Sequence, residues 1–165
     1  MTQDIIAIVN QHIADANVVA FMQMIRFSEG TNNEQGYTEL FGGSHFENFD
    51  THPKQTLCLP AGIGRKLCSD AAGAYQIMGK TFDGLVAEYG NDFLPDFKPE
   101  TQDKMCCLLL CGRGAFMNVV NGQFETAVTK CALEWASLPN SPYGQPTHTM
   151  EVVQAEYEKN GGVIA

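Results

Sequence analysis

Residues 27–31 read Phe27-Ser28-Glu29-Gly30-Thr31, and they end an apolar segment on an acidic residue followed by glycine. Apolar side chains recur at helical spacing just before this point, at Phe21, Met24, Ile25 and Phe27. We expect Asn17 to cap the start of this helix and Gly30 to follow its last turn. Glu29 would then lie at the negative end of the helix dipole beside apolar neighbours. Both effects disfavour an ionised carboxylate and raise its pKa.

A carboxyl group that keeps its proton near neutral pH can act as a general acid. Cleavage of a glycosidic bond requires such a group, because the leaving oxygen must receive a proton. A single glutamate at a helix end is more often a solvated surface residue. The assignment of Glu29 as a catalytic acid therefore depends on the rest of the chain.

The remaining sequence predicts an α+β fold that is mostly helical. Apolar periodicity indicates further helices at residues 4–14, 81–89, 99–111, 122–136 and 148–160. Between residues 31 and 70 glycine, asparagine, proline and aromatic residues replace this periodicity, and weak strands at 37–41 and 56–59 indicate a small sheet or hairpin lobe. With 165 residues and no linker, we expect a single domain over residues 1–165.

Several short motifs follow the 27–31 segment in a fixed order. They are Gly36-Tyr37, Phe41-Gly42-Gly43, Phe46 and Phe49 before His52-Pro53, Ala72-Gly73-Ala74-Tyr75-Gln76-Ile77, Trp135-Ala136-Ser137-Leu138-Pro139 and Tyr143-Gly144-Gln145. In this order and spacing the series resembles the lambda lysozyme family of phage endolysins, from about residue 16 to the C-terminus. Residues 1–15 form a predicted extra helix at the N-terminus.

This resemblance implies a lysozyme-like fold with a substrate cleft between its two lobes, and a lytic transglycosylase activity. Such enzymes cleave the β-1,4 bond between N-acetylmuramic acid and N-acetylglucosamine in peptidoglycan and leave a 1,6-anhydro product. The family's catalytic glutamate matches Glu29. The matching motifs supply the expected substrate-binding residues, which are Ser28, Tyr37, Tyr75, Gln76, Ser137, Tyr143 and Gln145. The only tryptophan, Trp135, fits core packing better than sugar stacking.

A hydrolytic lysozyme on the same fold is the alternative, and such an enzyme normally needs a second carboxylate. Thr38 and Thr51 stand where relatives often carry acidic residues, which weakens the assignment of a second acidic residue to the mechanism. The candidates for that group are Glu34, Glu39, Glu47 and Asp50. An inactive wall-binding protein of the virion is a further alternative, and an unrelated inhibitor or chaperone is the least favoured.

Charge and cysteine content restrict the partners. A net charge of −9 argues against nucleic-acid binding and against adhesion to anionic membranes. The six cysteines show no zinc spacing, so no metal or cofactor is expected; Cys58 and Cys68 flank a loop and are able to pair under oxidising conditions. The N-terminus lacks the features of a signal peptide. We therefore expect a monomer made in the host cytoplasm, without membrane insertion, that reaches the periplasmic cell wall when a holin opens the membrane.

Overall fold

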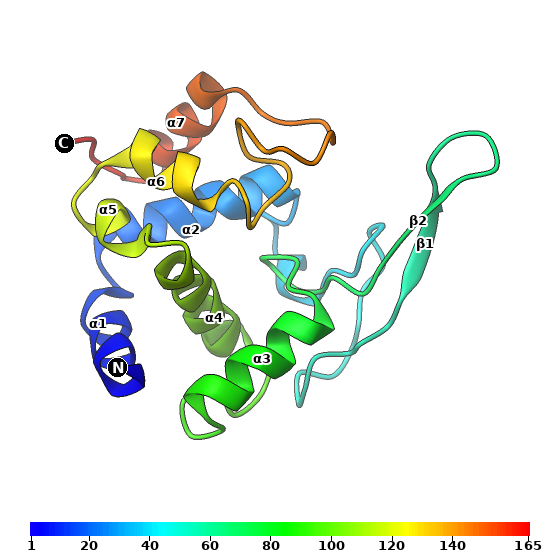
Figure 1. Ribbon diagram of the computed structural model, residues 1–165, viewed down its shortest axis with the longest axis horizontal. Coiled ribbons are helices and arrows are strands. Elements are labelled where there is room, and N and C mark those ends of the chain that lie inside the picture. Colours follow the sequence, from blue (N-terminus) through cyan, green and yellow to red (C-terminus); the bar gives the residue numbers. More distant parts are fainter. The chain divides into compact units, whose positions relative to one another are not determined.

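The computed structural model describes all residues, 1–165, and its architecture is α+β, as the sequence predicts (Figure 1). The elements in chain order are α1 (Thr2–His12), α2 (Ala16–Glu29), the 3-10 helix η1 (Gly36–Thr38), β1 (Leu57–Pro60), β2 (Lys66–Ser69), α3 (Gly79–Tyr89), α4 (Pro99–Gly112), α5 (Phe116–Val120), α6 (Phe124–Cys131) and α7 (Met150–Lys159). They form two compact units, one of residues 1–30 and 103–165, the other of residues 31–102.

The first unit is organised around α2, which packs against α5 and α7. The Phe21 ring of α2 lies 5.8 Å from Phe124 and 6.3 Å from Tyr157, in edge-to-face geometry. Such aromatic contacts add to the free energy gained by burying the rings. The helix ends as predicted, because Gly30 adopts a left-handed conformation with a φ of 77° and caps the last turn. The C-terminal end of α2 is therefore fixed by both packing and backbone geometry.

The prediction that Asn17 caps α2 is wrong. Asp15 occupies the cap position, and Asn17 lies inside the helix. The Asn17 side chain instead donates to the Val120 carbonyl at 3.3 Å and accepts from the Val163 backbone amide at 2.9 Å. These partners lie far away in the sequence. An asparagine near a helix start suggests a local capping role, but the hydrogen bonds of Asn17 are long-range.

The second unit contains the sheet, a single antiparallel hairpin in which Cys58 pairs with Cys68 across β1 and β2. These two cysteines form a disulfide. The strand predicted at residues 56–59 is thus confirmed, one residue later, as β1, whereas the one predicted at residues 37–41 is wrong. That segment overlaps the end of η1 and takes part in two isolated bridges, Glu39 to His45 and Leu40 to Ala72. Helical expectations for the other segments hold to within two residues, except that 122–136 forms only α6, which ends at Cys131.

Side-chain amides replace regular strands in this unit. Gln102 accepts a bond from the Ala74 amide at 2.8 Å and donates to the carbonyls of Tyr37 at 3.0 Å and Phe97 at 2.8 Å. Gly73 lies against this amide with a φ of 82°, and a Cβ at that position would overlap the Gln102 side chain. Only glycine fits there, which explains its place in the Gly-x-Tyr-Gln motif.

No single helix of the chain is long and apolar enough to cross a membrane. Only α1 and α2 taken together reach that length and apolarity, with a bend of 94° between them. Buried core helices meet the same criterion, and most side chains of α2 are buried.

His52 holds the loop after Asp50 by two hydrogen bonds that define its protonation state. Its Nε2 lies 2.7 Å from the Ile77 carbonyl, and its Nδ1 accepts from the Lys54 amide at 2.9 Å. A ring nitrogen that accepts from an N–H cannot carry a proton, so His52 is neutral. Burial lowers the pKa of His52; the Ile77 carbonyl, Asp70 and Asp83 oppose this effect, and Lys54 adds to it.

Because the folded-state pKa of His52 lies below its unfolded value, its contribution to stability is present above about pH 6.5 and is lost as the pH falls through the folded-state value. We expect His52→Gln to destabilise the fold by roughly 1–3 kcal/mol at pH 7.5, because the amide lacks the ring that packs on Phe82 and Phe97. The difference from wild type should shrink toward pH 4.5, because wild type loses stability as the imidazole is protonated, whereas the amide does not titrate. Urea unfolding across this pH range measures it, with the exposed His45→Gln as control. A difference independent of pH would contradict the assignment.

Candidate active site

Glu29 is the last residue of α2 and is half-buried. Burial raises the pKa of its carboxyl group, and a hydrogen bond from Ser137 opposes that effect. The Ser137 hydroxyl donates to Oε2 of Glu29 at 2.6 Å. One carboxyl oxygen is thus held in place, and the group is biased toward its protonated form.

Ser28 extends this contact into a chain of two hydrogen bonds. Its hydroxyl oxygen lies 2.7 Å from that of Ser137, and Ser28 is only 7% exposed. Ser137 has a single hydroxyl proton and gives it to Glu29, so Ser28 donates the second bond. The chain Ser28 to Ser137 to Glu29 therefore fixes the carboxyl with groups from two segments far apart in the sequence.

Buried neighbours position Ser137. Trp135 is 2% exposed and Leu138 is fully buried, so the side chains on either side of Ser137 anchor its loop in the core of the first unit. The Ser137 carbonyl also accepts from the His148 amide at 3.0 Å, just before α7. Trp135 consequently serves as a core residue, and its ring is not available for stacking on a sugar.

Tyr143 and Gln145 belong to the same unit and lie in the irregular segment between α6 and α7. The Tyr143 hydroxyl donates to the Leu133 carbonyl at 2.8 Å, which fixes the tip of the side chain, yet the residue is 54% exposed. Gln145 is exposed as well. Both residues therefore offer surface to a ligand.

Three of the expected substrate-binding residues belong to the second unit. Tyr75 is 2% exposed and its ring lies 6.4 Å from that of Tyr37, edge to face. Gln76 has a φ of 49°, and its Nε2 donates to the carbonyls of Gly73 at 2.9 Å and Glu39 at 3.2 Å. These bonds orient the amide so that its oxygen remains free to accept from a ligand. Gln102 organises this region by its hydrogen bonds. The sequence does not indicate that role, because glutamine is an ordinary polar residue in a helix.

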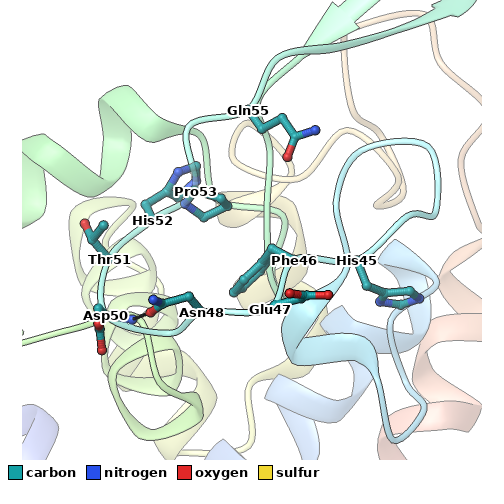
Figure 2. Close-up of a pocket in the computed structure, with 9 residues that line it drawn as sticks. All are labelled: His45, Phe46, Glu47, Asn48, Asp50, Thr51, His52, Pro53 and Gln55. Atoms are coloured by element: carbon teal, nitrogen blue, oxygen red, sulfur yellow. Dashed lines mark hydrogen bonds between the residues drawn. The ribbon is translucent and has the colours of Figure 1, made fainter.

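A pocket of about 480 Å³ lies within the second unit. Figure 2 shows the residues that line it, which are His45, Phe46, Glu47, Asn48, Asp50, Thr51, His52, Pro53 and Gln55. Two candidates for a second carboxylate, Glu47 and Asp50, are among them. The Asp50 amide is tied to the Asn48 side chain at 2.7 Å, so its loop is ordered locally. A third candidate, Glu39, has a pKa raised by burial and lowered in part by His45.

The fold is shared with solved phage lysozymes. Bacteriophage lambda lysozyme, complexed with a chitohexasaccharide, matches with a TM-score of 0.82 and 30% identity, over 92% of this chain and 97% of that one. A second structure of lysozyme from bacteriophage lambda gives a TM-score of 0.77 and 29% identity over the same shares of both chains. The fold, with a protonatable carboxyl at the end of α2, places the chain among the lysozyme-like glycosidases that degrade peptidoglycan.

Sequence comparison agrees with this class. Residues 19–164 match the sequence model of the Endolysin family, so the matched region begins after α1. The endolysin of Escherichia phage lambda is 32% identical over 88% of this chain and 91% of its own length. The endolysin of Escherichia phage P2 is also 32% identical, over 96% of this chain and 99% of its own. The chain belongs to the Endolysin family, whose members have a lysozyme-like function in phage lysis.

The hydrogen bond from Ser137 is the one effect that lowers the pKa of Glu29 against burial. We therefore expect Ser137→Ala to raise this pKa further, and Ser28→Ala to raise it less, because Ser28 acts only through Ser137. Carboxyl ¹³C titration of glutamate-labelled protein measures the shift. Ser141→Ala is the control, since the Ser141 hydroxyl is buried in the same loop without a hydrogen-bond partner. An unchanged or lowered pKa of Glu29 in Ser137→Ala would refute the hydrogen-bond order Ser28 to Ser137 to Glu29.

Proposed function

We propose that this endolysin is a lytic transglycosylase that cleaves the β-1,4 bond between N-acetylmuramic acid and N-acetylglucosamine in peptidoglycan. The observation that carries the proposal is the state of Glu29. Its pKa is raised by burial, and one of its oxygens is fixed by Ser137. A carboxyl group held in this way is suited to give a proton to a leaving oxygen and then to take one back.

The reaction requires only this one carboxyl group. The proton of Glu29 passes to the glycosidic oxygen as the bond from that oxygen to C1 of muramic acid breaks. The resulting carboxylate accepts the proton of the muramic acid C6 hydroxyl, whose oxygen bonds to C1 and closes the 1,6-anhydro ring. The attacking hydroxyl belongs to the substrate, so its effective concentration is high without an activated water.

Ser137 contributes to both steps by holding Oε2. Its hydrogen bond strengthens when Glu29 becomes a carboxylate, because charge-assisted hydrogen bonds are stronger than neutral ones. In the neutral form of Glu29 the proton resides on Oε1, the oxygen to which Ser137 does not donate. Ser28 and Ser137 are thus positioning residues rather than primary sugar contacts. Contacts to sugar hydroxyl and N-acetyl groups are assigned to Tyr37, Gln76, Tyr143 and Gln145. Tyr75, which is only 2% exposed, is assigned the role of supporting the Tyr37 ring, 6.4 Å away.

A hydrolytic lysozyme is the alternative and needs an ionised second carboxylate. Glu39 fits that role poorly, since burial favours its neutral form. Glu34, Glu47 and Asp50 remain as candidates within residues 34–50. The chitohexasaccharide in the lambda lysozyme structure supports a cleft for a β-1,4-linked amino-sugar chain, which both reactions require.

The cysteines agree with synthesis in a reducing compartment and action in an oxidising one. Cys106, Cys107 and Cys131 are buried free thiols, as expected for a protein made in the host cytoplasm. Cys58 and Cys68 are paired, as expected in a periplasm. We assign the passage between the two to a holin, and the enzyme to action as a monomer without a metal or cofactor.

Glu29→Gln should abolish cleavage, because an amide of nearly the same shape cannot exchange a proton. A loss on the order of 10²-fold or more is expected. Turbidity loss of chloroform-treated Gram-negative cells measures the rate, and thermal unfolding at neutral pH checks the fold. The variant should be at least as stable as wild type there, since no desolvated carboxyl remains to be ionised. Near-normal activity in the folded variant would remove Glu29 from the mechanism.

The product separates the two reactions. Mass spectrometry of digested peptidoglycan should show 1,6-anhydro-muramic acid ends. The single variants Glu34→Gln, Glu39→Gln, Glu47→Gln and Asp50→Asn should each retain substantial activity, because no protein carboxylate has to activate water. Complete loss in one of them, together with muramic acid at a reducing end, would establish a hydrolase with two carboxylates.

A further inference from the structure

The β1–β2 hairpin is a positively charged element of an acidic protein. Residues 57–69 contain Arg65 and Lys66 and no acidic residue, whereas the whole chain carries a net charge of −9. We call residues 59–67, which comprise the connecting turn and the strand ends beside it, the hairpin tip. Its charge is opposite in sign to that of the chain as a whole, so it attracts anions that the rest of the chain repels.

The two cations of the hairpin tip, Arg65 and Lys66, form no ion pair within the protein. Elsewhere Lys54 pairs with Asp83 at 2.7 Å, and Arg113 pairs with Glu134 at 2.7 Å. The side chains of Arg65 and Lys66 are exposed and make no hydrogen bond or ion pair. Both are therefore available to an external anionic group.

Apolar side chains accompany these charges. Ile63 stands fully exposed in the turn, and Leu59 and Leu67, which face each other across the strands, are 40% and 44% exposed. Figure 1 shows the hairpin extending away from α3 of the same unit. A single exposed apolar residue is ordinary, but three beside two unpaired cations form a surface that suits a ligand with both apolar and anionic groups.

The hairpin tip is ordered before any ligand arrives. The disulfide between Cys58 and Cys68 joins the pair next to Leu59 and Leu67. The turn is closed by a bond from the Ala61 amide to the Arg65 carbonyl at 3.0 Å, and Gly64 has a φ of 70°. An isolated two-stranded hairpin is marginally stable, so the disulfide supplies order that the short strands lack. Less conformational entropy is then lost on binding.

We propose that the hairpin tip binds the peptide stems of peptidoglycan, with Arg65 and Lys66 on stem carboxylates and Ile63 on the neighbouring methyl groups. This inference rests on the proposed function, because it assigns a second contact with the same polymer. A stem is a short peptide that contains both alanine and carboxylate-bearing residues. It therefore offers carboxylates to the two cations and methyl groups to the exposed apolar side chains, neither of which has such a partner within the protein.

An anionic membrane fits the charge distribution less well. A lipid surface presents its potential to every charge within about a Debye length, roughly 8–10 Å. A chain with a net charge of −9 is repelled by such a surface except at the hairpin tip. A single stem reaches the two cations without bringing the acidic remainder of the protein against a charged plane.

Binding is measured in the Glu29→Gln background, so that the ligand is not consumed. The test variant adds Arg65→Gln and Lys66→Gln, and the matched control adds Lys80→Gln and Lys98→Gln, two exposed cations of the same unit. Fluorescence anisotropy follows three probes, which are labelled glycan strands with stems, the same strands after removal of the stems, and phosphatidylglycerol vesicles. Thermal unfolding confirms that all variants are folded.

We expect the test variant to bind stem-bearing strands roughly three- to tenfold more weakly than the control at low salt. The difference should vanish near 0.5 M salt, because exposed charges are then screened, and it should be absent on stem-free strands. Equal binding by test variant and control, an equal loss on stem-free strands, or a loss confined to vesicles would each overturn the proposal. Absence of anhydro products from wild-type digests would instead reject the transglycosylase assignment, which this binding test does not measure.

Discussion

Glu29 at the C-terminal end of α2 is the proposed catalytic acid, and that role requires a carboxyl group that is desolvated enough to hold a proton and fixed in one direction. These requirements conflict, because burial raises the pKa of Glu29 while the hydrogen bond that orients it lowers the pKa. The first unit satisfies both by using a neutral donor, Ser137, which fixes one oxygen without placing a positive charge beside it. A lysine or arginine there would favour the ionised carboxylate strongly and remove the acid. The buried loop around Trp135 and the aromatic packing of α2 hold these two segments in place.

The second unit solves a different problem, namely how a segment with little regular secondary structure satisfies its buried backbone groups. Gln102 and His52 do so with side chains that bond backbone amides and carbonyls of several turns. A buried backbone group without a partner costs about 1–3 kcal/mol, so each such side chain replaces part of a strand ladder. The side chains of Tyr75 and Gln76 therefore have defined orientations in a tight turn, although the regular sheet consists only of the short β1–β2 hairpin.

The sequence predicts those features that depend on local backbone chemistry. Gly30 and Gly90 end helices and Pro99 begins one, because their conformational preferences act wherever they stand. The sequence predicts structure poorly where a polar side chain forms hydrogen bonds with residues far away in the sequence. Asn17 resembles a cap yet bonds Val120 and Val163, and residues 37–41 resemble a strand although Gln102 takes one of their carbonyls. In the same way the sequence names Ser28, Glu29 and Ser137 as site residues, but not their chain of bonds, since 109 positions separate the two serines.

Six cysteines can in principle be joined into three bridges in fifteen ways. Burial removes nearly all of these possibilities here. It raises the pKa of Cys111 to about 11 and of Cys131 to about 12, and it raises those of Cys106 and Cys107 as well, so few thiolates exist to attack a disulfide. Cys58 and Cys68 are exposed, close in sequence and opposed across one hairpin. Once the helices have packed, oxidation has a single accessible outcome, and the chain reaches its native connectivity without a sorting step among wrong partners.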